Sequence, residues 1–250
     1  GFCWDAGTAA SGANTDGSIN IASGDQWVNA TAGFSITKLT GSSSNNTFGH
    51  GLSAPPEFII AKSYDETLDW RVYHTSVGPD YGGLKLNEND SKGNTDSEYW
   101  GTGMTNDLIT LKSGGSGGNN RNSENMIYYA WTPIAGYSSF GKYTGNGSSD
   151  GPFVYTGFRP RFILIKNTTS GGNWNLFDSA RSTYNPTGHL FLPNTADDEF
   201  TESPYNDFLS NGFKLRTNDS NQSGSNANQS SDTYLYAAFA EHPFKTARAR

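Results

Sequence analysis

Short apolar runs separated by polar turn residues make up most of this chain. The runs are rich in aromatic and β-branched residues, and Gly, Asn, Asp, Ser and Pro fill the gaps between them. No window shows a convincing 3.6-residue apolar period, so no helix is expected. The pattern predicts an all-β protein, with strands at 34–40, 58–62, 70–74, 84–87, 108–112, 126–131, 139–144, 162–166, 174–178, 190–192, 213–217 and 234–239.

The predicted strands fall into two sets that are related by a constant offset. An offset of 104 residues links Trp70 in LDWRVYH to Trp174 in GNWNLFD. The same offset links Gly41 to Gly145, Pro56 to Pro160, Phe58 to Phe162, Lys62 to Lys166, Ile109 to Phe213 and Leu111 to Leu215. The chain is therefore expected to carry one structural unit twice, at roughly 100 to 110 residues per copy, an ordinary size for a compact domain.

This repeat divides the 250 residues into three expected parts. Residues 33–132 are expected to form repeat 1, and residues 133–250 repeat 2 with a basic C-terminal tail. Residues 2–4, Phe-Cys-Trp, resemble the closing strand of each repeat. Residues 1–32 are therefore expected to be the closing strand of a preceding copy, followed by a linker.

Two kinds of apolar pattern occur among the predicted strands. The runs 57–62 and 161–166 are apolar at consecutive positions, which is typical of central strands covered on both faces. Residues 70–74 alternate instead. With at least six strands per copy, this mixture predicts two tandem β-sandwich domains of a jelly-roll type, with a small barrel as the alternative. Because Trp70 and Trp174 repeat at one framework position, both are expected in the core.

Two polar segments occupy equivalent places in the repeats. Residues 113–125 contain SGGSGGNN and residues 218–232 contain SNQSGSNANQSS. Both are rich in Gly, Ser and Asn, so they are expected to be flexible, solvent-exposed loops.

Charge and cysteine content exclude several classes of function. The net charge is −7 and no basic cluster lies inside the chain, which argues against a nucleic-acid partner. No apolar run approaches the roughly 18 residues that span a bilayer, so no membrane insertion is expected. Cys3 is the sole cysteine, which excludes an intrachain disulfide and a cysteine-based zinc site. No cofactor is expected.

An acidic cluster is the main candidate for catalytic chemistry. Asp197, Asp198, Glu199 and Glu202 lie in one polar connection, whereas a glycosidase needs two carboxylates held on either side of a bond. A solvated acidic loop is the favoured interpretation, and a calcium site there or around Asp150 is the alternative. We expect no catalytic residue and no metal site, and we predict that the protein is not an enzyme.

Aromatic residues that break the repeat are the better candidates for ligand contacts, because loops carry binding residues on a repeated scaffold. These candidates are Tyr81, Tyr99, Trp100, Tyr184 and His189. A flat ring flanked by Asn, Asp and Ser suits stacking on a sugar ring with hydrogen bonds to its hydroxyls. Burial in a contact between subunits is the competing interpretation. Asp178 and Arg181 in FDSAR are expected to form a local ion pair.

Longer stretches of the chain carry a family resemblance. The strings AGFSITKLTG, GHGL, KYTGNGSSDGPFVYTGFRPRFILIK, NWNLFDSARSTYNP, SNGFKLRT and YAAFAEHPFK resemble the tandem repeat domains of bacteriophage virion proteins, common in marine and cyanobacterial phages. The resemblance implies lectin-like β-sandwich modules, without catalytic residues, in a tail fibre-like or structural protein of the virion that is assembled in the host cytoplasm. The strings LTGSSSNN and SKGNTDSEYWG of the first copy depart from the family pattern.

The expected partners follow from this resemblance. They are other virion subunits, further copies of the chain in a homo-oligomer, for which a trimer is expected in a fibre, and a glycan on the host surface. The alternatives are a capsid decoration or another purely structural virion module, and a secreted bacterial lectin-like adhesin.

Overall fold

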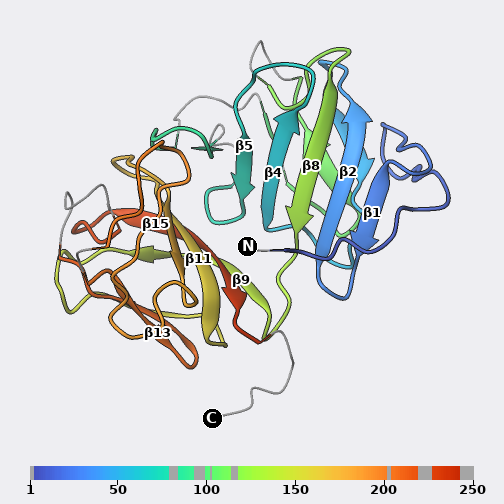
Figure 1. The fold of residues 1–250 in the computed structure, drawn as a ribbon. Coiled ribbons are helices and arrows are strands. Elements are labelled where there is room, and N and C mark those ends of the chain that lie inside the picture. The colour runs from blue at the N-terminus through green and yellow to red at the C-terminus, as the bar shows by residue number, and fades with distance from the viewer. Residues whose placement is uncertain are drawn as a thin grey trace. The chain divides into compact units, whose positions relative to one another are not determined.

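The computed structural model describes residues 3–78, 84–92, 99–101, 103–113, 118–201, 204–218 and 227–242. Within these ranges the chain forms fifteen strands and no helix, so the predicted all-β class is confirmed (Figure 1). The strands are β1 (Gln26–Asn29), β2 (Phe34–Thr40), β3 (Asn46–Gly49), β4 (Phe58–Ser63), β5 (Arg71–His74), β6 (Leu84–Lys85), β7 (Leu108–Leu111), β8 (Asn125–Trp131), β9 (Ser138–Thr144), β10 (Phe153–Tyr155), β11 (Pro160–Asn167), β12 (Asn175–Asp178), β13 (Asn206–Leu209), β14 (Gly212–Leu215) and β15 (Thr233–Ala240).

The strands belong to two compact units. Unit 1 contains Gly1–Lys85 and Lys92–Ile134, and unit 2 contains Leu86–Ser91 and Ala135–Arg250. Unit 1 has a large sheet in the order β1-β2-β8-β4-β5-β6 and a small sheet β3-β7, and unit 2 has the sheets β12-β11-β15-β9 and β10-β14-β13. The order β2-β8-β4-β5 in unit 1 recurs in unit 2 as β9-β15-β11-β12. In the described residues no sheet closes on itself, and every strand pair is antiparallel.

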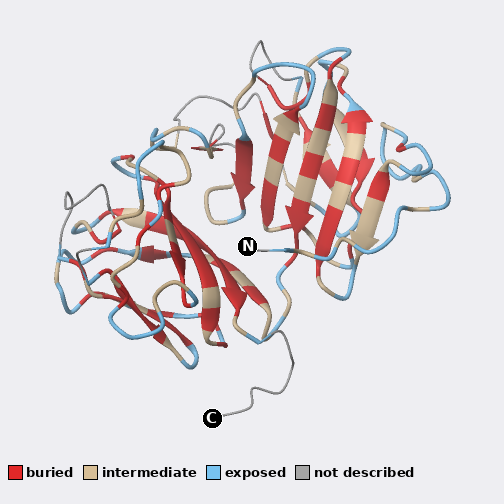
Figure 2. Ribbon diagram, viewed as in Figure 1, coloured by how far each residue is buried: buried red, intermediate tan, exposed pale blue. Residues whose placement is uncertain are grey.

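In each unit the two sheets share one core. In unit 2 the ring of Phe213 on β14 meets the ring of Tyr236 on β15 edge-on, with 5.5 Å between centroids. In unit 1 the ring of Phe48 on β3 lies 4.8 Å from that of Tyr128 on β8. Figure 2 shows the buried positions concentrated along these strands. Two sheets with a common core are compatible with a β-sandwich.

The two runs of consecutive apolar residues form central strands, as predicted. β4 pairs with β5 and β8, and β11 pairs with β12 and β15. Ile163, Leu164 and Ile165 of β11 are all buried, so both faces of this strand are covered. Ile60 of β4 is only half-buried, which shows that the cover over unit 1 is less complete.

The two repeated tryptophans differ in burial. Trp174 is fully buried, whereas Trp70 is 39% exposed, so the prediction of two core tryptophans is correct for Trp174 and wrong for Trp70. Beyond β12 in unit 2, Leu176 bridges Phe191, and the side chain of Asn194 accepts a hydrogen bond from the backbone N–H of Trp174 at 2.9 Å. In unit 1 the partner of β5 on the side away from β4 is the two-residue strand β6.

The segment expected to be a linker is part of unit 1. β1 pairs with β2, and Ile21 is buried in the core of this unit. Gln26 is also buried, and its side-chain amide donates to the carbonyl of Gly49 at 2.7 Å. The segment was missed because its position is fixed largely by backbone and amide hydrogen bonds, which leave no apolar period in the sequence. Cys3 and Trp4 form no strand.

The two polar loops are not solvent-exposed throughout. Among their described residues, Asn119, Asn120, Ala227 and Asn228 are fully buried. The expected solvent exposure is therefore wrong at these positions, while residues 114–117 and 219–226 of the two segments lie outside the described residues.

Candidate functional site

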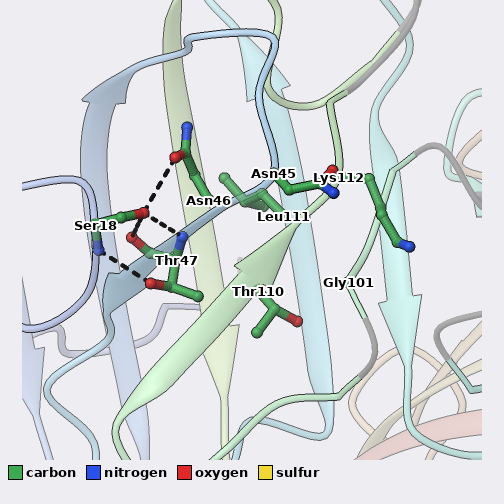
Figure 3. Close-up of a pocket in the computed structure, with 8 residues that line it drawn as sticks. All are labelled: Ser18, Asn45, Asn46, Thr47, Gly101, Thr110, Leu111 and Lys112. Carbon is green, nitrogen blue, oxygen red and sulfur yellow. Dashed lines mark hydrogen bonds between the residues drawn. The ribbon is translucent and has the colours of Figure 1, made fainter.

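A pocket of about 370 Å³ lies in unit 1 beside β3 and β7 (Figure 3). Its wall combines the ends of these two strands with the segments around Ser18 and Gly101. Its lining residues are Ser18, Asn45, Asn46, Thr47, Gly101, Thr110, Leu111 and Lys112.

Hydrogen bonds hold the polar wall of the pocket in place. The hydroxyl of Ser18 donates to Oδ1 of Asn46 at 3.1 Å and accepts from the backbone N–H of Thr47 at 2.9 Å. The backbone N–H of Ser18 donates in turn to Oγ1 of Thr47 at 3.0 Å. On the other wall, Oγ1 of Thr110 donates to the carbonyl of Gly103 at 2.8 Å. The wall is therefore preorganised, which reduces the entropy lost when a ligand binds.

A glycine keeps this pocket open. The backbone N–H of Gly101 donates to the carbonyl of Thr110 at 2.9 Å, so the two residues are close neighbours across the sheet. A Cβ atom at Gly101 would lie 2.6 Å from Cβ of Thr110, closer than real Cβ contacts. A larger residue at 101 would therefore displace the wall.

The pocket is lined mainly by neutral hydroxyl and amide groups. Lys112 is the one ionisable side chain among the lining residues, and the lining includes no carboxylate, imidazole or thiol. Hydroxyl and amide groups both donate and accept hydrogen bonds, so they match a neutral ligand rich in hydroxyls. The arrangement provides groups for binding, whereas proton transfer requires a group that titrates near the working pH.

The corresponding place in unit 2 carries charged side chains. Lys214 on β14 stands 104 residues after Thr110, and its Nζ lies 2.8 Å from Oδ1 of Asp150 and 2.7 Å from the carbonyl of Gly151. The hydrogen bond and charge of Lys214 lower the pKa of Asp150. The two repeats thus differ in chemistry at one framework position.

The predicted ligand residues of the first repeat are buried or lie outside the described residues. Tyr81 falls outside them. Tyr99 and Trp100 belong to the core of unit 1, where the guanidinium of Arg71 lies 3.9 Å from the Tyr99 ring centroid and Trp100 meets Tyr73 edge-on. The expectation that their rings face a ligand is wrong. Their burial follows from the bridge of Trp100 to Leu111, which places Trp100 in the sheet beside the pocket.

The predicted ligand residues of the second repeat remain accessible. Tyr184 is 85% exposed, so its ring is free to meet a ligand or a neighbouring protein. His189 is half-buried and faces Glu199, with 3.2 Å between its Nδ1 and Oε2 of Glu199. Among the described residues no hydrogen bond, ion pair or ring contact joins Tyr184 to His189.

Arg181 ties the acidic loop to the end of β12. Its Nε lies 2.7 Å from Oδ2 of Asp178, which confirms the predicted ion pair, and its NH1 contacts Glu199. Burial alone would raise the pKa of Asp178, but hydrogen bonds from Arg181 and from the backbone outweigh it and lower this pKa. Glu199 is therefore held in place, whereas Asp197 and Asp198 are exposed, as expected for a solvated loop.

Buried Lys166 makes the stability of unit 2 depend on pH. Burial lowers the pKa of its amine to about 8, and Asp90 opposes that shift. Between about pH 8 and 10 the unfolded chain keeps this proton while the folded chain has lost it, so the free energy of unfolding rises with pH. Above pH 10 the trend reverses, because burial raises the pKa values of Tyr143 and Tyr234 in the same unit.

We expect the contribution of Lys166 to the free energy of unfolding to rise by about 2 kcal/mol from pH 8 to pH 10. Urea titrations at both pH values measure this change. Lys166→Met should remove it, while Lys62→Met, at the equivalent half-buried position, should leave it intact. An unchanged pH dependence in Lys166→Met would contradict the assignment.

No group of three or more metal-binding side chains occurs in the described ranges. Among the same residues, no helix is long and apolar enough to cross a membrane.

Fold and site together define an all-β protein of two structurally repeated units, one of which holds a pocket lined by hydroxyl and amide groups. The chain belongs to a family known as a domain of unknown function (DUF7483), whose model matches residues 1–243. No curated protein and no solved structure matches the chain.

Proposed function

We propose that this protein is a structural component of a phage virion, tail fibre-like, that contributes to attachment to a glycan on the host surface. The observation that carries the binding role is the neutral, preorganised pocket of unit 1. The phage assignment rests on the sequence resemblance. We further propose that each unit is a β-sandwich of jelly-roll, lectin-like type, which the shared core of its two sheets supports.

The size and chemistry of the pocket favour a sugar. About 370 Å³ lies in the range of small-molecule sites, roughly 300–1,000 Å³. Sugar hydroxyls both donate and accept hydrogen bonds, as the side chains of Ser18, Asn46 and Thr110 also do. A neutral glycan matches this lining better than a phosphorylated ligand does, because Lys112 is the one cation there. The protein would act by binding and not by catalysis.

Assembly of several copies would raise the overall affinity of the protein for a glycan. A single shallow pocket binds a sugar weakly, but several linked copies raise the overall affinity by roughly 10²–10⁴. The proposed partners are therefore other virion subunits and further copies of this chain, with a trimer proposed for the assembled fibre. A capsid decoration and a secreted bacterial adhesin remain the alternatives. Imaging of the protein on virions distinguishes a capsid decoration, which would cover the shell, from a fibre on the tail. An encoded signal peptide upstream would favour the adhesin.

Thr110→Lys is expected to close the pocket and abolish glycan binding. Unit 2 carries Lys214 at this position, so the framework accommodates the side chain, and the new amine would reach the carbonyl of Asn45 as Lys214 reaches Gly151. We expect at least a tenfold loss of affinity for a glycan identified by array screening, because an occupied pocket excludes the ligand.

Thr8→Lys is the matched control, because it makes the same change at an exposed residue of unit 1 away from the pocket. It should bind like the wild type. Equal binding by Thr110→Lys and the wild type would place the glycan elsewhere, and no binding by the assembled wild type to any glycan would remove the receptor role.

A further inference from the structure

One edge of the small sheet in unit 2 is unpaired within the described residues. β10 is the last strand in the order β10-β14-β13. Its middle residue, Val154, faces the core, while Phe153 and Tyr155 are 46% and 66% exposed. Two large rings therefore project side by side from an edge strand, an arrangement that soluble monomers usually avoid.

The backbone groups of these two residues point away from the sheet. The N–H of Leu215 donates to the carbonyl of Pro152 at 3.1 Å, and the N–H of Thr156 donates to the carbonyl of Asn211 at 3.0 Å. In an antiparallel pair, successive residues of one strand direct their N–H and C=O groups alternately toward the partner strand and away from it. Since Pro152 and Thr156 bond toward β14, Val154 does so as well. Phe153 and Tyr155 accordingly present theirs to the open edge.

The corresponding edge of unit 1 is covered. Phe48 pairs with Ile109 as Val154 pairs with Phe213, so Thr47 and Gly49 correspond to Phe153 and Tyr155. The carbonyl of Thr47 accepts from the N–H groups of Ser18 and Ile19, both at 2.9 Å, and the N–H of Gly49 donates to the carbonyl of Asp16, also at 2.9 Å. The fold thus completes this edge in unit 1 with a second segment of chain.

The opposite edge of the small sheet in unit 2 is covered as well. The N–H of Thr187 donates to the carbonyl of Asn206 on β13 at 2.6 Å. The side chain of Asn185 accepts from the N–H of Phe208 and donates to its carbonyl, both at 2.9 Å. Of the three edges compared, those of β3 and β13 are covered by other segments of the chain, and that of β10 is open within the described residues.

We propose that β10 pairs with β10 of a second copy of this chain, antiparallel, about a two-fold axis at Val154. In this register Phe153 lies opposite Tyr155 of the second copy, and Tyr155 lies opposite Phe153 of the second copy. The outward N–H and C=O groups of both residues then form two reciprocal hydrogen-bonded pairs. The rings stack as cross-strand aromatic pairs, each worth roughly 0.2–1 kcal/mol. A two-fold contact of this kind is self-complementary, as symmetry requires.

The side chains favour a second copy over a segment like that of unit 1. At Gly49 a Cβ atom would lie 2.5 Å from Oδ1 of Asn14, so the covering segment of unit 1 needs a glycine there. Tyr155 fills that position in unit 2 and excludes such a segment. A partner strand that also exposes aromatic rings fits instead.

Charge around β10 does not oppose the contact. Lys214 pairs with Asp150 at 2.8 Å, and Arg216 pairs with Asp207 at 2.7 Å. These charges pair within one copy, so the four side chains bring no net charge to the contact. An interface made by two three-residue strands is small compared with the roughly 1,200–2,000 Å² that stable interfaces bury. The dimer is therefore weak in solution and gains strength in an assembled array.

A charge exchange tests this contact. Analytical ultracentrifugation of the full chain over increasing concentration should show a reversible monomer–dimer equilibrium. Phe153→Lys with Tyr155→Lys, and Phe153→Glu with Tyr155→Glu, should each stay monomeric, because like charges face each other. An equimolar mixture should form a heterodimer, which unfolded variants would not do. Tyr64→Lys, at an exposed tyrosine of unit 1, should dimerise like the wild type.

A second measurement needs no variant. Hydrogen exchange of the backbone amides of Phe153 and Tyr155 should slow as the protein concentration rises, while the already bonded amide of Gly49 should not change. A wild type that stays monomeric with unchanged exchange at these two amides would overturn the proposal. So would a dimer that persists in both charged variants. Either result is independent of glycan binding.

Discussion

Trp174→Ala is expected to lower the free energy of unfolding of unit 2 by about 3–5 kcal/mol. Its indole is fully buried, and its backbone N–H donates to Oδ1 of Asn194. Removal of the ring leaves a large cavity beside Lys166, whose amine lies 5.7 Å from the ring centroid. Close-packed surroundings relax only partly into such a cavity, so the cost exceeds the lost transfer energy alone.

The repeat supplies the control for this prediction. Trp70→Ala removes the same side chain 104 residues earlier, where the ring is 39% exposed, and we expect a smaller cost of about 1–2 kcal/mol. Urea unfolding of each variant, followed by hydrogen exchange to assign the transition to a unit, measures both. Equal losses for the two variants would contradict the burial difference.

Asn228→Ala is expected to cost about 2–4 kcal/mol, because it leaves several buried polar groups without a partner. Oδ1 of Asn228 accepts from the N–H of Asn146 at 2.9 Å. Its Nδ2 donates to the carbonyls of Ser148 and Thr217, both at 2.8 Å. One fully buried side chain therefore joins two backbone segments, at 146–148 and at 217, that lie far apart in the sequence.

A buried asparagine of the first repeat makes equivalent hydrogen bonds, which gives a second test of this prediction. Asn120 accepts from the N–H of Ser42 at 3.1 Å and donates to the carbonyls of Ser44 at 2.6 Å and Lys112 at 3.0 Å. Asn120→Ala should cost as much as Asn228→Ala, whereas exposed Asn218→Ala should cost less than about 0.5 kcal/mol. Thermal unfolding compares the three variants, and a loss in Asn218→Ala as large as in the others would contradict the role of burial.

The sequence pattern predicted most of the large sheets, because their strands combine β-branched and aromatic residues with clear turn signals. Phe34–Thr40 coincides with β2, and the apolar runs before Lys62 and Lys166 became the central strands β4 and β11. The pattern did not predict β1, β3, β10 and β13. These strands have three or four residues each, and their sequences QWVN, NTFG, FVY and NDFL are too short to show a period. The predicted strand at 190–192 is reduced to isolated bridges.

The candidate site was harder to predict than the fold. Its groups come from Ser18, Thr47, Gly101 and Thr110, which single hydrogen bonds and one close glycine contact bring together over long sequence distances. The predicted aromatic residues illustrate the opposite error. Trp100 looked like a loop residue because polar residues surround it, yet its bridge to Leu111 draws it into the core. A sequence signal for the pocket does exist, because the repeat offset aligns neutral Thr110 with charged Lys214 at one framework position.

The proposed role in glycan attachment depends most directly on where a sugar contacts the protein. Titration of the isotope-labelled protein with a glycan selected by array screening, followed through backbone amide chemical shifts, locates that contact. We predict that the largest shifts cluster at Ser18, Thr47, Gly101 and Thr110, and that they vanish in Thr110→Lys. Shifts confined to other residues, or none with any glycan of the panel, would contradict the account.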